Sequence, residues 1–167
     1  MDIYNIINIE RRICIEPQYL DSEIESHLLN KIKKVTKNEC SKEYGYILEV
    51  LQIIEIKNNN VSSANSDIVF TVIFEAKTLL PNIGNKYSGK ILLILPESIL
   101  LVIIHKRLRS LIPVSNLQDY IYNGESKQYH SKNNPNKILM IGNTVCTKIV
   151  GMKYNKQTFS CFGTLDE

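Results

Sequence analysis

The sequence contains no tryptophan, and its cysteines do not form a metal-binding or disulfide pattern. Cys14, Cys40, Cys146 and Cys161 are widely spaced, and no C-x-x-C motif occurs. Structural zinc sites and small disulfide-bonded domains depend on closely ordered cysteines. The pattern therefore favours reduced thiols, and it predicts neither a metal site nor a cofactor.

Long hydrophobic runs are also missing. The most apolar segment, residues 91–104, is interrupted by Pro96-Glu97-Ser98, whereas a membrane-spanning helix needs about 20 apolar residues. The first ten residues lack the basic start and the apolar run of a signal peptide. We expect no membrane association.

Motifs of the common enzyme classes are absent from the sequence as well. His27, His105 and His130 have no neighbours at the spacing of metal ligands, and no G-x-S-x-G motif is present. These absences predict a non-catalytic protein.

One segment, G-N-K-Y-S-G-K-I from Gly84 to Ile91, resembles a phosphate-binding loop. Such a loop needs Ser or Thr after its lysine as a Mg²⁺ ligand, and a helix must follow it. Here Ile91 occupies the ligand position and a branched apolar run follows, which is typical of strands. Nucleotide binding at Gly84–Lys90 is therefore the weakest functional hypothesis.

The charge differs between the two halves of the chain. Residues 1–80 contain 9 Lys and Arg against 12 Asp and Glu, and residues 81–167 contain 11 against 5. This asymmetry indicates two modules, of which the second either meets a polyanion or has a solvated basic face.

The first half has the pattern of a small sheet with one helix. Residues 7–16 alternate as a half-buried strand, with Pro17 ending it, and residues 23–36 have helical spacing with Asp21 or Ser22 available as a cap. Two more alternating segments, 44–56 and 68–76, are separated by a polar segment, 57–67. We predict the order β-α-β-β, with that polar segment as a loop. The residues expected on the core-facing sides are Ile7, Ile9, Ile13, Ile15, Ile24, Leu28, Ile32, Val35, Tyr44, Tyr46, Leu48, Val50, Ile54, Ile56, Ile68, Phe70, Val72, Phe74 and Ala76.

The second half has an all-β pattern. Short apolar segments at 90–95, 99–105, 110–114, 144–150 and 158–164 are separated by turn residues. Five such strands fit a small barrel of the OB type, and the long connection from Asn116 to Asn136 has the length of a functional or disordered loop. The predicted fold class is α+β, with one domain at 1–82 and an OB barrel at 83–167.

Three stretches carry a resemblance to a known family. C-S-K-E-Y-G-Y-I-L-E-V (Cys40–Val50) is similar to a C-x-G-K-[FY]-G-Y-[IV]-L segment, with Lys42-Glu43 as a departure. Asp67–Ile91 resembles a strand ending in a hydrophobic-Pro step before two glycines, and K-I-V-G-M…F-S-C-F-G-T-L resembles closing strands. The chain thus resembles the seventh subunit of eukaryotic RNA polymerase II and its counterpart in the archaeal RNA polymerase. That family joins a truncated ribonucleoprotein-like domain to an OB barrel of the ribosomal S-one type. Gly84 and Gly89 would then lead the chain into the first barrel strand, where tight turns and close backbone approach favour glycine.

The resemblance implies a non-catalytic stalk subunit of a multisubunit DNA-dependent RNA polymerase. Its expected partners are the polymerase core, including the largest subunits and the clamp, a small helical protein of the fourth-subunit type where one exists, and nascent single-stranded RNA. The family's docking end is the tip of the first domain. The residues carried over to that tip are Pro17, Gln18, Glu43, Tyr44, Gly45, Tyr46, Asn58, Asn59, Asn60 and Ser62.

The barrel is the expected RNA-facing module. OB surfaces bind single strands through a basic groove and stacking aromatic rings. The candidate RNA-binding residues are Lys106, Arg107, Arg109, Tyr120, Tyr122, Lys127, Tyr129, Lys148 and Lys153. A free-standing OB-type RNA-binding protein remains the alternative.

The composition is rich in Ile, Asn and Lys. Together with the divergence from the family pattern, it suggests the polymerase of a large cytoplasmic DNA virus. We then expect a location in the virus factory and virion, or in the nucleus if the protein is cellular.

Overall fold

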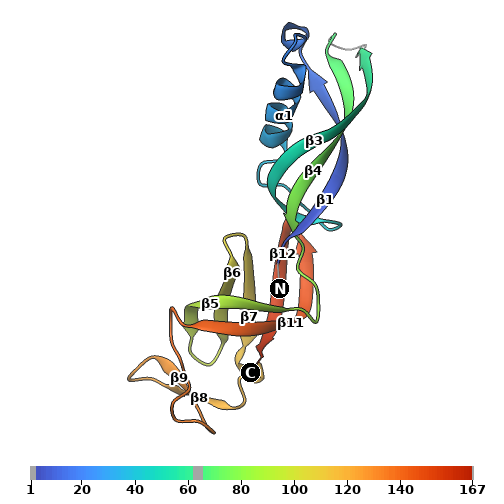
Figure 1. The fold of residues 1–167 in the computed structure, drawn as a ribbon. Coiled ribbons are helices and arrows are strands. Elements are labelled where there is room, and N and C mark those ends of the chain that lie inside the picture. Colours follow the sequence, from blue (N-terminus) through green and yellow to red (C-terminus); the bar gives the residue numbers. More distant parts are fainter. Residues whose placement is uncertain (1–2, 62–65, 167) are drawn as a thin grey trace. The chain divides into compact units, whose positions relative to one another are not determined.

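The computed structural model describes residues 3–61 and 66–166, with side chains described for residues 3–57 and 66–166. The chain divides into two compact units, Met1–Leu80 and Pro81–Glu167. Each unit has strands that pair only within that unit (Figure 1). Each unit also has its own cluster of buried hydrophobic residues.

The N-terminal unit has the predicted β-α-β-β order with two small additions. Its antiparallel sheet has the strand order β1-β4-β3-β2. The elements in chain order are β1 (Asn5–Ile15), η1 (Pro17–Tyr19), α1 (Ile24–Val35), β2 (Cys40–Ser41), β3 (Gly45–Val61) and β4 (Ile68–Leu79).

Helix α1 lies within one residue of its predicted bounds at each end. The N-cap residue is Glu23, and no side chain in the described part of the chain caps the helix, so the predicted cap at Asp21 or Ser22 was wrong. The backbone N–H of Glu23 donates to Asp21 Oδ1 at 2.8 Å, in the turn just before the helix. Leu28 and Ile32 are fully buried, but Val35 is 46% exposed, so its predicted place in the core was wrong. Thr36 is buried instead, because its hydroxyl donates to the Ile32 carbonyl at 2.7 Å and leaves no unpaired polar group.

Strands β1 and β4 follow the predicted alternation. Ile9, Ile13 and Ile15 of β1 are buried, and Phe70, Val72, Phe74 and Ala76 of β4 pack in the same core with the helix. This part of the predicted core is confirmed.

Strand β3 departs from the predicted alternation. Its register with β4 shifts by one residue between Ile47 and Glu49. The same shift then recurs every three residues along the strand. Each shift inserts an extra residue, so the core-facing side chains are Ile47, Val50 and Ile53. The period-two prediction therefore placed Ile54 wrongly, since Ile54 is passed over at a shift and is 48% exposed. Ile56 pairs with the core residue Val72 as a core-facing residue would, but it is 38% exposed and adds little to the core. β3 also continues to Val61, so Asn58–Val61 pair with β4 and are not part of a loop.

The C-terminal unit contains the predicted barrel. It is closed in the order β11-β12-β7-β6-β5, with β12 parallel to β7 and the other neighbours antiparallel. The barrel strands are β5 (Lys86–Leu95), β6 (Ile99–His105), β7 (Leu108–Pro113), β11 (Thr144–Asn155) and β12 (Thr158–Leu165).

The long connection between β7 and β11 is not a structureless loop. After η2 (Val114–Asn116), it forms a small sheet with the order β10-β9-β8 from β8 (Tyr120–Asn123), β9 (Gln128–Ser131) and β10 (Ile138–Leu139). Leu117, Tyr120, Tyr129 and Leu139 pack against the inward-facing barrel residues. The insertion therefore contributes to the barrel core.

The two glycines of the phosphate-loop-like segment have the roles expected of them. Gly84 has φ +90°, and its N–H donates to the Ile149 carbonyl at 2.7 Å. A side chain at Gly89 would lie 2.6 Å from the carbonyl oxygen of Ile103. Because Gly89 and Lys90 belong to strand β5, which a turn and another strand follow, the segment lacks the loop and helix that bind phosphate.

Candidate functional site

The turn between β2 and β3 is held by a polar network on the core-facing side of the sheet. Arg11 donates to Glu39 Oε2 at 2.9 Å and Oε1 at 2.5 Å, and to the hydroxyl oxygen of Tyr44 at 2.8 Å. The Tyr44 hydroxyl in turn donates to Glu39 Oε1 at 2.5 Å. The Glu39 carboxylate therefore connects Arg11 of strand β1 to Tyr44, the residue just before β3.

The three groups change one another's ionisation. The hydrogen bonds from Arg11 lower the pKa of Glu39, and the same contact raises the pKa of Arg11. The pKa of Tyr44 is raised, first by burial and then by its hydrogen bond to Glu39. At neutral pH the network consists of an ion pair and a neutral phenol.

Sequence reasoning missed this network, although it left a signal. Arg11 lies between Ile9 and Ile13 on the core-facing side of an alternating strand. A charged residue at such a position needs a paired partner, because an unpaired charge is costly to bury. The pattern alone therefore indicates that Arg11 has an acidic partner, although it does not identify Glu39.

We expect the folded chain to lose stability at acidic pH in part through Glu39. Because its pKa is lower in the folded state, Glu39 stabilises the fold above its ordinary value of 4.5, and this contribution disappears as the pH falls through the folded-state pKa. Since the pair is partly exposed, the contribution is modest, about 1 kcal/mol. Urea unfolding of wild type and Glu39→Gln between pH 7 and pH 3 measures it. The difference in free energy of unfolding between wild type and Glu39→Gln should shrink toward acidic pH. A difference that stays constant with pH would contradict this role.

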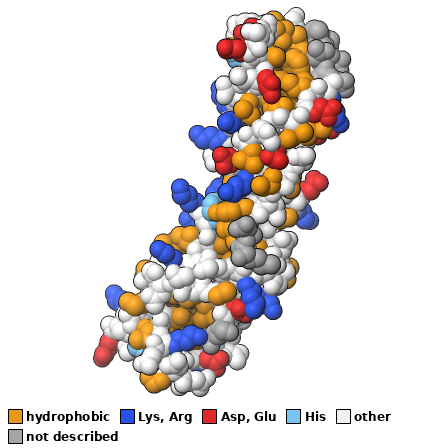
Figure 2. Space-filling model, in the orientation of Figure 1, with side chains coloured by type: hydrophobic (Ala, Val, Ile, Leu, Met, Phe, Trp, Pro, Cys, Tyr) orange, Lys and Arg blue, Asp and Glu red, His pale blue; other side chains and the backbone are white. Residues whose placement is uncertain are grey.

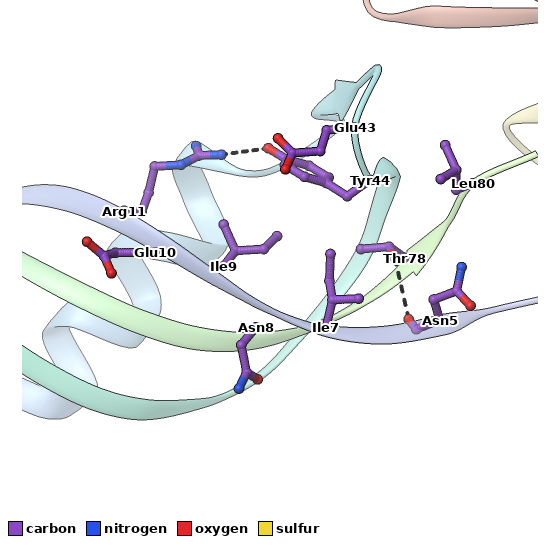
Figure 3. A pocket seen from close by; sticks show the side chains of 10 residues that line it. All are labelled: Asn5, Ile7, Asn8, Ile9, Glu10, Arg11, Glu43, Tyr44, Thr78 and Leu80. Atoms are coloured by element: carbon purple, nitrogen blue, oxygen red, sulfur yellow. Dashed lines mark hydrogen bonds between the residues drawn. The ribbon is translucent and has the colours of Figure 1, made fainter.

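A pocket of about 480 Å³ lies beside this network (Figure 3). Ile7, Ile9 and Arg11 point from β1 toward the turn that carries Glu43 and Tyr44, whereas Asn8 points the other way. The lining residues are Asn5, Ile7, Asn8, Ile9, Glu10, Arg11, Glu43, Tyr44, Thr78 and Leu80. The pocket combines aliphatic walls with a rim of charged and hydroxyl groups.

The predicted docking residues do not form one cluster. Tyr46 pairs with Leu79 at one end of β4, and Val61 and Ile15 both pair with Ile68 at the other end. At about 3.3 Å per residue, the two ends lie roughly 35 Å apart. The expectation that the Glu43–Tyr46 segment lies close to the tip was therefore wrong, because a long strand separates them.

Within each end, the predicted residues differ in what they expose. Pro17 and Gln18 are exposed in η1, and Gln18 donates to Glu16 at 2.7 Å. Glu43 is exposed and Tyr44 is half-buried, but Tyr46 is buried, so its ring is not available to a partner. Asn58, Asn59 and Asn60 contribute backbone to β3; their side chains, and Ser62 altogether, lie outside the described residues.

The basic candidates of the barrel fall into separate groups. Lys106 and Arg107 form the β6–β7 turn, next to Arg109 at the start of β7. Ser160 pairs with Lys153, and the next residue, Cys161, pairs with Ser110, so Arg109 and Lys153 lie on either side of Ser160. Lys148 pairs with Lys86 farther along β11, and Lys127 lies in the β8–β9 turn.

Burial and the neighbouring positive charges both act on the histidine at the β6–β7 turn. The pKa of His105 is lowered, first by burial and then by the charges of Lys106 and Arg107. His105 is therefore neutral at pH 7, and the turn's charge comes from Lys and Arg.

The aromatic candidates are less available than predicted. Tyr129 is only 2% exposed and Tyr120 only 8%, so neither offers a ring face for stacking. Tyr122 is half-buried, with its ring centroid 5.2 Å from that of Tyr129. The predicted stacking loop was therefore wrong for Tyr120 and Tyr129, because the insertion uses their rings as core.

Metal ligation and membrane crossing find no support in the described part of the chain. In residues 3–61 and 66–166, no group of three or more His, Cys, Asp or Glu residues is arranged to hold a metal ion. Among the helices of the same described residues, none is both long and apolar enough to cross a membrane.

Comparison with known proteins finds one family and a limited structural likeness. Residues 10–70 match the model of the SHS2 domain found in the N terminus of Rpb7p/Rpc25p/MJ0397, which confirms the predicted resemblance for the N-terminal unit. No curated protein sequence matches the chain. The solved apo form of Mycoplasma genitalium RNase R is similar over 48% of this chain and 13% of its own, with 18% identity and a TM-score of 0.38.

Proposed function

We propose that this chain is a non-catalytic stalk subunit of a multisubunit DNA-dependent RNA polymerase. The observation that carries the proposal is the order of its parts: an SHS2 domain of the Rpb7p/Rpc25p/MJ0397 type at residues 10–70, followed by a closed five-stranded barrel. In this function the N-terminal unit attaches the subunit to the polymerase core, and the barrel contacts nascent RNA.

We assign attachment to the end of the N-terminal unit that carries η1. Pro17 and Gln18 are exposed there, and Tyr19 and Leu20 follow with 42% exposure each. Exposed tyrosine and leucine beside an ordered turn supply the apolar contact that stable interfaces need. The opposite end presents Glu43 at the rim of a pocket and serves as the matched control.

A tagged copy expressed in the native source should co-purify with the largest polymerase subunits, as identified by mass spectrometry. The source is the infected cytoplasm for a viral protein and the nucleus for a cellular one. Gln18→Arg with Leu20→Arg should reduce recovery of those subunits at least tenfold, because two buried cations at an interface are costly. Glu43→Arg should leave recovery unchanged, and the same sample would identify any small helical partner.

Two results would contradict these assignments. Absence of polymerase subunits from the wild-type sample would reject the stalk function. Loss of recovery with Glu43→Arg alone would move the attachment to the pocket end.

The charge of the barrel supports RNA contact. The five barrel strands contain Lys86, Lys90, Arg109, Lys148 and Lys153 and no Asp or Glu. Arg109 of β7 and Lys153 of β11 lie two strands apart, roughly 10 Å, with Ser160 of β12 between them, and Arg109 is next to the Lys106-Arg107 turn. This group fits the phosphates of a single strand better than the scattered Lys127 and Lys148.

Binding of a labelled 12-residue oligouridine should be weak and salt-dependent. Arg109→Gln with Lys153→Gln should weaken it severalfold at low salt and reduce the slope of log affinity against log salt by about 0.7 for each phosphate that is no longer neutralised. Lys127→Gln is the control, because it lies in the β8–β9 turn. An unchanged slope would show that Arg109 and Lys153 do not contact RNA phosphates. Tight binding of RNA without any polymerase would instead favour a free-standing RNA-binding protein.

A further inference from the structure

The outer wall of the barrel carries an unbroken row of apolar side chains. Leu93 of β5 pairs with Leu101 of β6, Leu101 with Leu111 of β7, and Leu111 with Phe162 of β12. The strand neighbours of these residues, such as Leu100 and Ile112, are buried inside the barrel, so the row faces outward. Leu93 and Phe162 are each 41% exposed, and the two leucines between them are partly exposed.

The apolar surface extends on both sides of this row. Leu95, Ile99 and Pro113 form the next outward row on β5, β6 and β7. On the other side, a groove of about 610 Å³ is lined by Leu92, Ile103, Ile104 and Ile141, with Lys90 among its lining residues. In the space-filling view, hydrophobic side chains reach the surface of the C-terminal unit between basic ones (Figure 2).

Positive charge borders the row. Lys90 and Arg109 both pair with Ile103, which places them in the outward row next to the apolar one. Within residues 3–61 and 66–166, neither Lys90 nor Arg109 forms a salt bridge. The described barrel strands also contain no acidic residue to neutralise them. A partner for this wall therefore needs apolar groups beside negative charge.

The side chains of the row favour protein over RNA. Single-stranded RNA gains its apolar contacts by stacking bases on aromatic rings, and the row offers three leucines and one phenylalanine. Leucines pack instead against the branched side chains of another protein. Three steps between strands span about 14 Å, which matches two to three turns of an α-helix.

We infer that the outer wall formed by β12, β7, β6 and β5 docks an amphipathic acidic helix of a partner protein. Aliphatic side chains of that helix would lie on the Leu93–Phe162 row, and its Asp or Glu residues would contact Lys90 and Arg109. The inference rests on the barrel alone and does not depend on the stalk function.

A synthetic peptide tests the surface in the full-length chain. The probe is an 18-residue labelled helix with leucines at i, i+4, i+7 and i+11 and glutamates along one side of that stripe, and its control has the same composition in scrambled order. Fluorescence anisotropy should show the ordered peptide binding at least tenfold more tightly than the scrambled one. Leu101→Ser with Leu111→Ser should remove that difference, and Lys90→Glu should weaken binding severalfold.

The matched control is Ile121→Ser, which changes an aliphatic residue with 59% exposure on β8 and should leave peptide binding unchanged. Thermal unfolding confirms that the double variant is folded, and Phe162→Ser repeats the test at a more exposed position of the row. Equal binding of ordered and scrambled peptides would overturn the inference. So would a tenfold loss of oligouridine binding in the double leucine variant with peptide binding retained, because the row would then be an RNA surface.

Discussion

Replacing Gly45 with alanine is expected to unfold the N-terminal unit under conditions in which the wild-type chain is native. Gly45 has φ +78°, and a Cβ built on it would lie 2.1 Å from the carbonyl oxygen of Leu79 and 2.7 Å from Leu80 Cα. These are backbone atoms at the junction of β3 and β4, so no side-chain rotation can make room. The strain and the displaced strand pairing together should cost more than about 3 kcal/mol.

The control for this prediction is Gly84→Ala. Gly84 also has a positive φ, of +90°, but apart from its two chain neighbours no residue of the described part of the chain has an atom within 4 Å of the added Cβ. Its cost should be about 1 kcal/mol, which is the backbone strain alone. Hydrogen exchange with mass spectrometry of the intact chain locates the loss of protection. If Gly45→Ala keeps native protection in β3 and β4, the close contact with Leu79 is not a constraint on the fold.

Replacing Phe74 with alanine is expected to have the next largest effect. Phe74 is fully buried in β4 and belongs to the cluster formed by α1, β1, β3 and β4. Truncating a buried phenylalanine costs about 3 to 5 kcal/mol, because the lost transfer energy adds to the cost of a cavity. Urea unfolding followed by circular dichroism should show a transition at much lower urea.

Phe162→Ala removes the same atoms from a side chain that is 41% exposed. Its cost should stay below about 1.5 kcal/mol, since much of the ring is already in water. Similar losses of stability for the two variants would show that burial in the N-terminal core does not determine how much stability the Phe74 side chain contributes.

The parts of the fold that follow regular periods could be predicted from the sequence. Strands β1 and β4 alternate apolar and polar residues against one helix, and the apolar runs around Ile91, Leu100 and Ile112 mark barrel strands. In β1 and β4 a buried face requires a fixed period, and in the barrel the short apolar runs are bounded by turn residues, so each pattern determines the element.

The parts that were missed have no such period. Strands β8, β9 and β10 are only two to four residues long, too short to show a period, so their pairing depends on tertiary contacts of Tyr120, Tyr129 and Leu139. The polar end of β3 is likewise held by backbone pairing to β4, which any side chain except proline permits.

The candidate sites depended on distances that the sequence does not contain. The docking set was drawn from both ends of β3, and only its strand length shows that Glu43 and Gln18 belong to different places. Arg109 and Lys153 are separated by more than forty positions in sequence, and the pairing of β12 with both β7 and β11 places them two strands apart.

The repeated register shifts of β3 bear on how this domain tolerates insertions and deletions. β3 uses 17 residues beside the 12 of β4, and Leu48, Leu51, Ile54 and Lys57 are the residues passed over at the shifts. Deleting one of them would restore a regular step and leave the side chains on either side facing as before. A deletion in β4 would turn every later residue to the opposite face. Related chains can thus vary in length inside β3 while their core is preserved, and an alignment gap there would not indicate a loop.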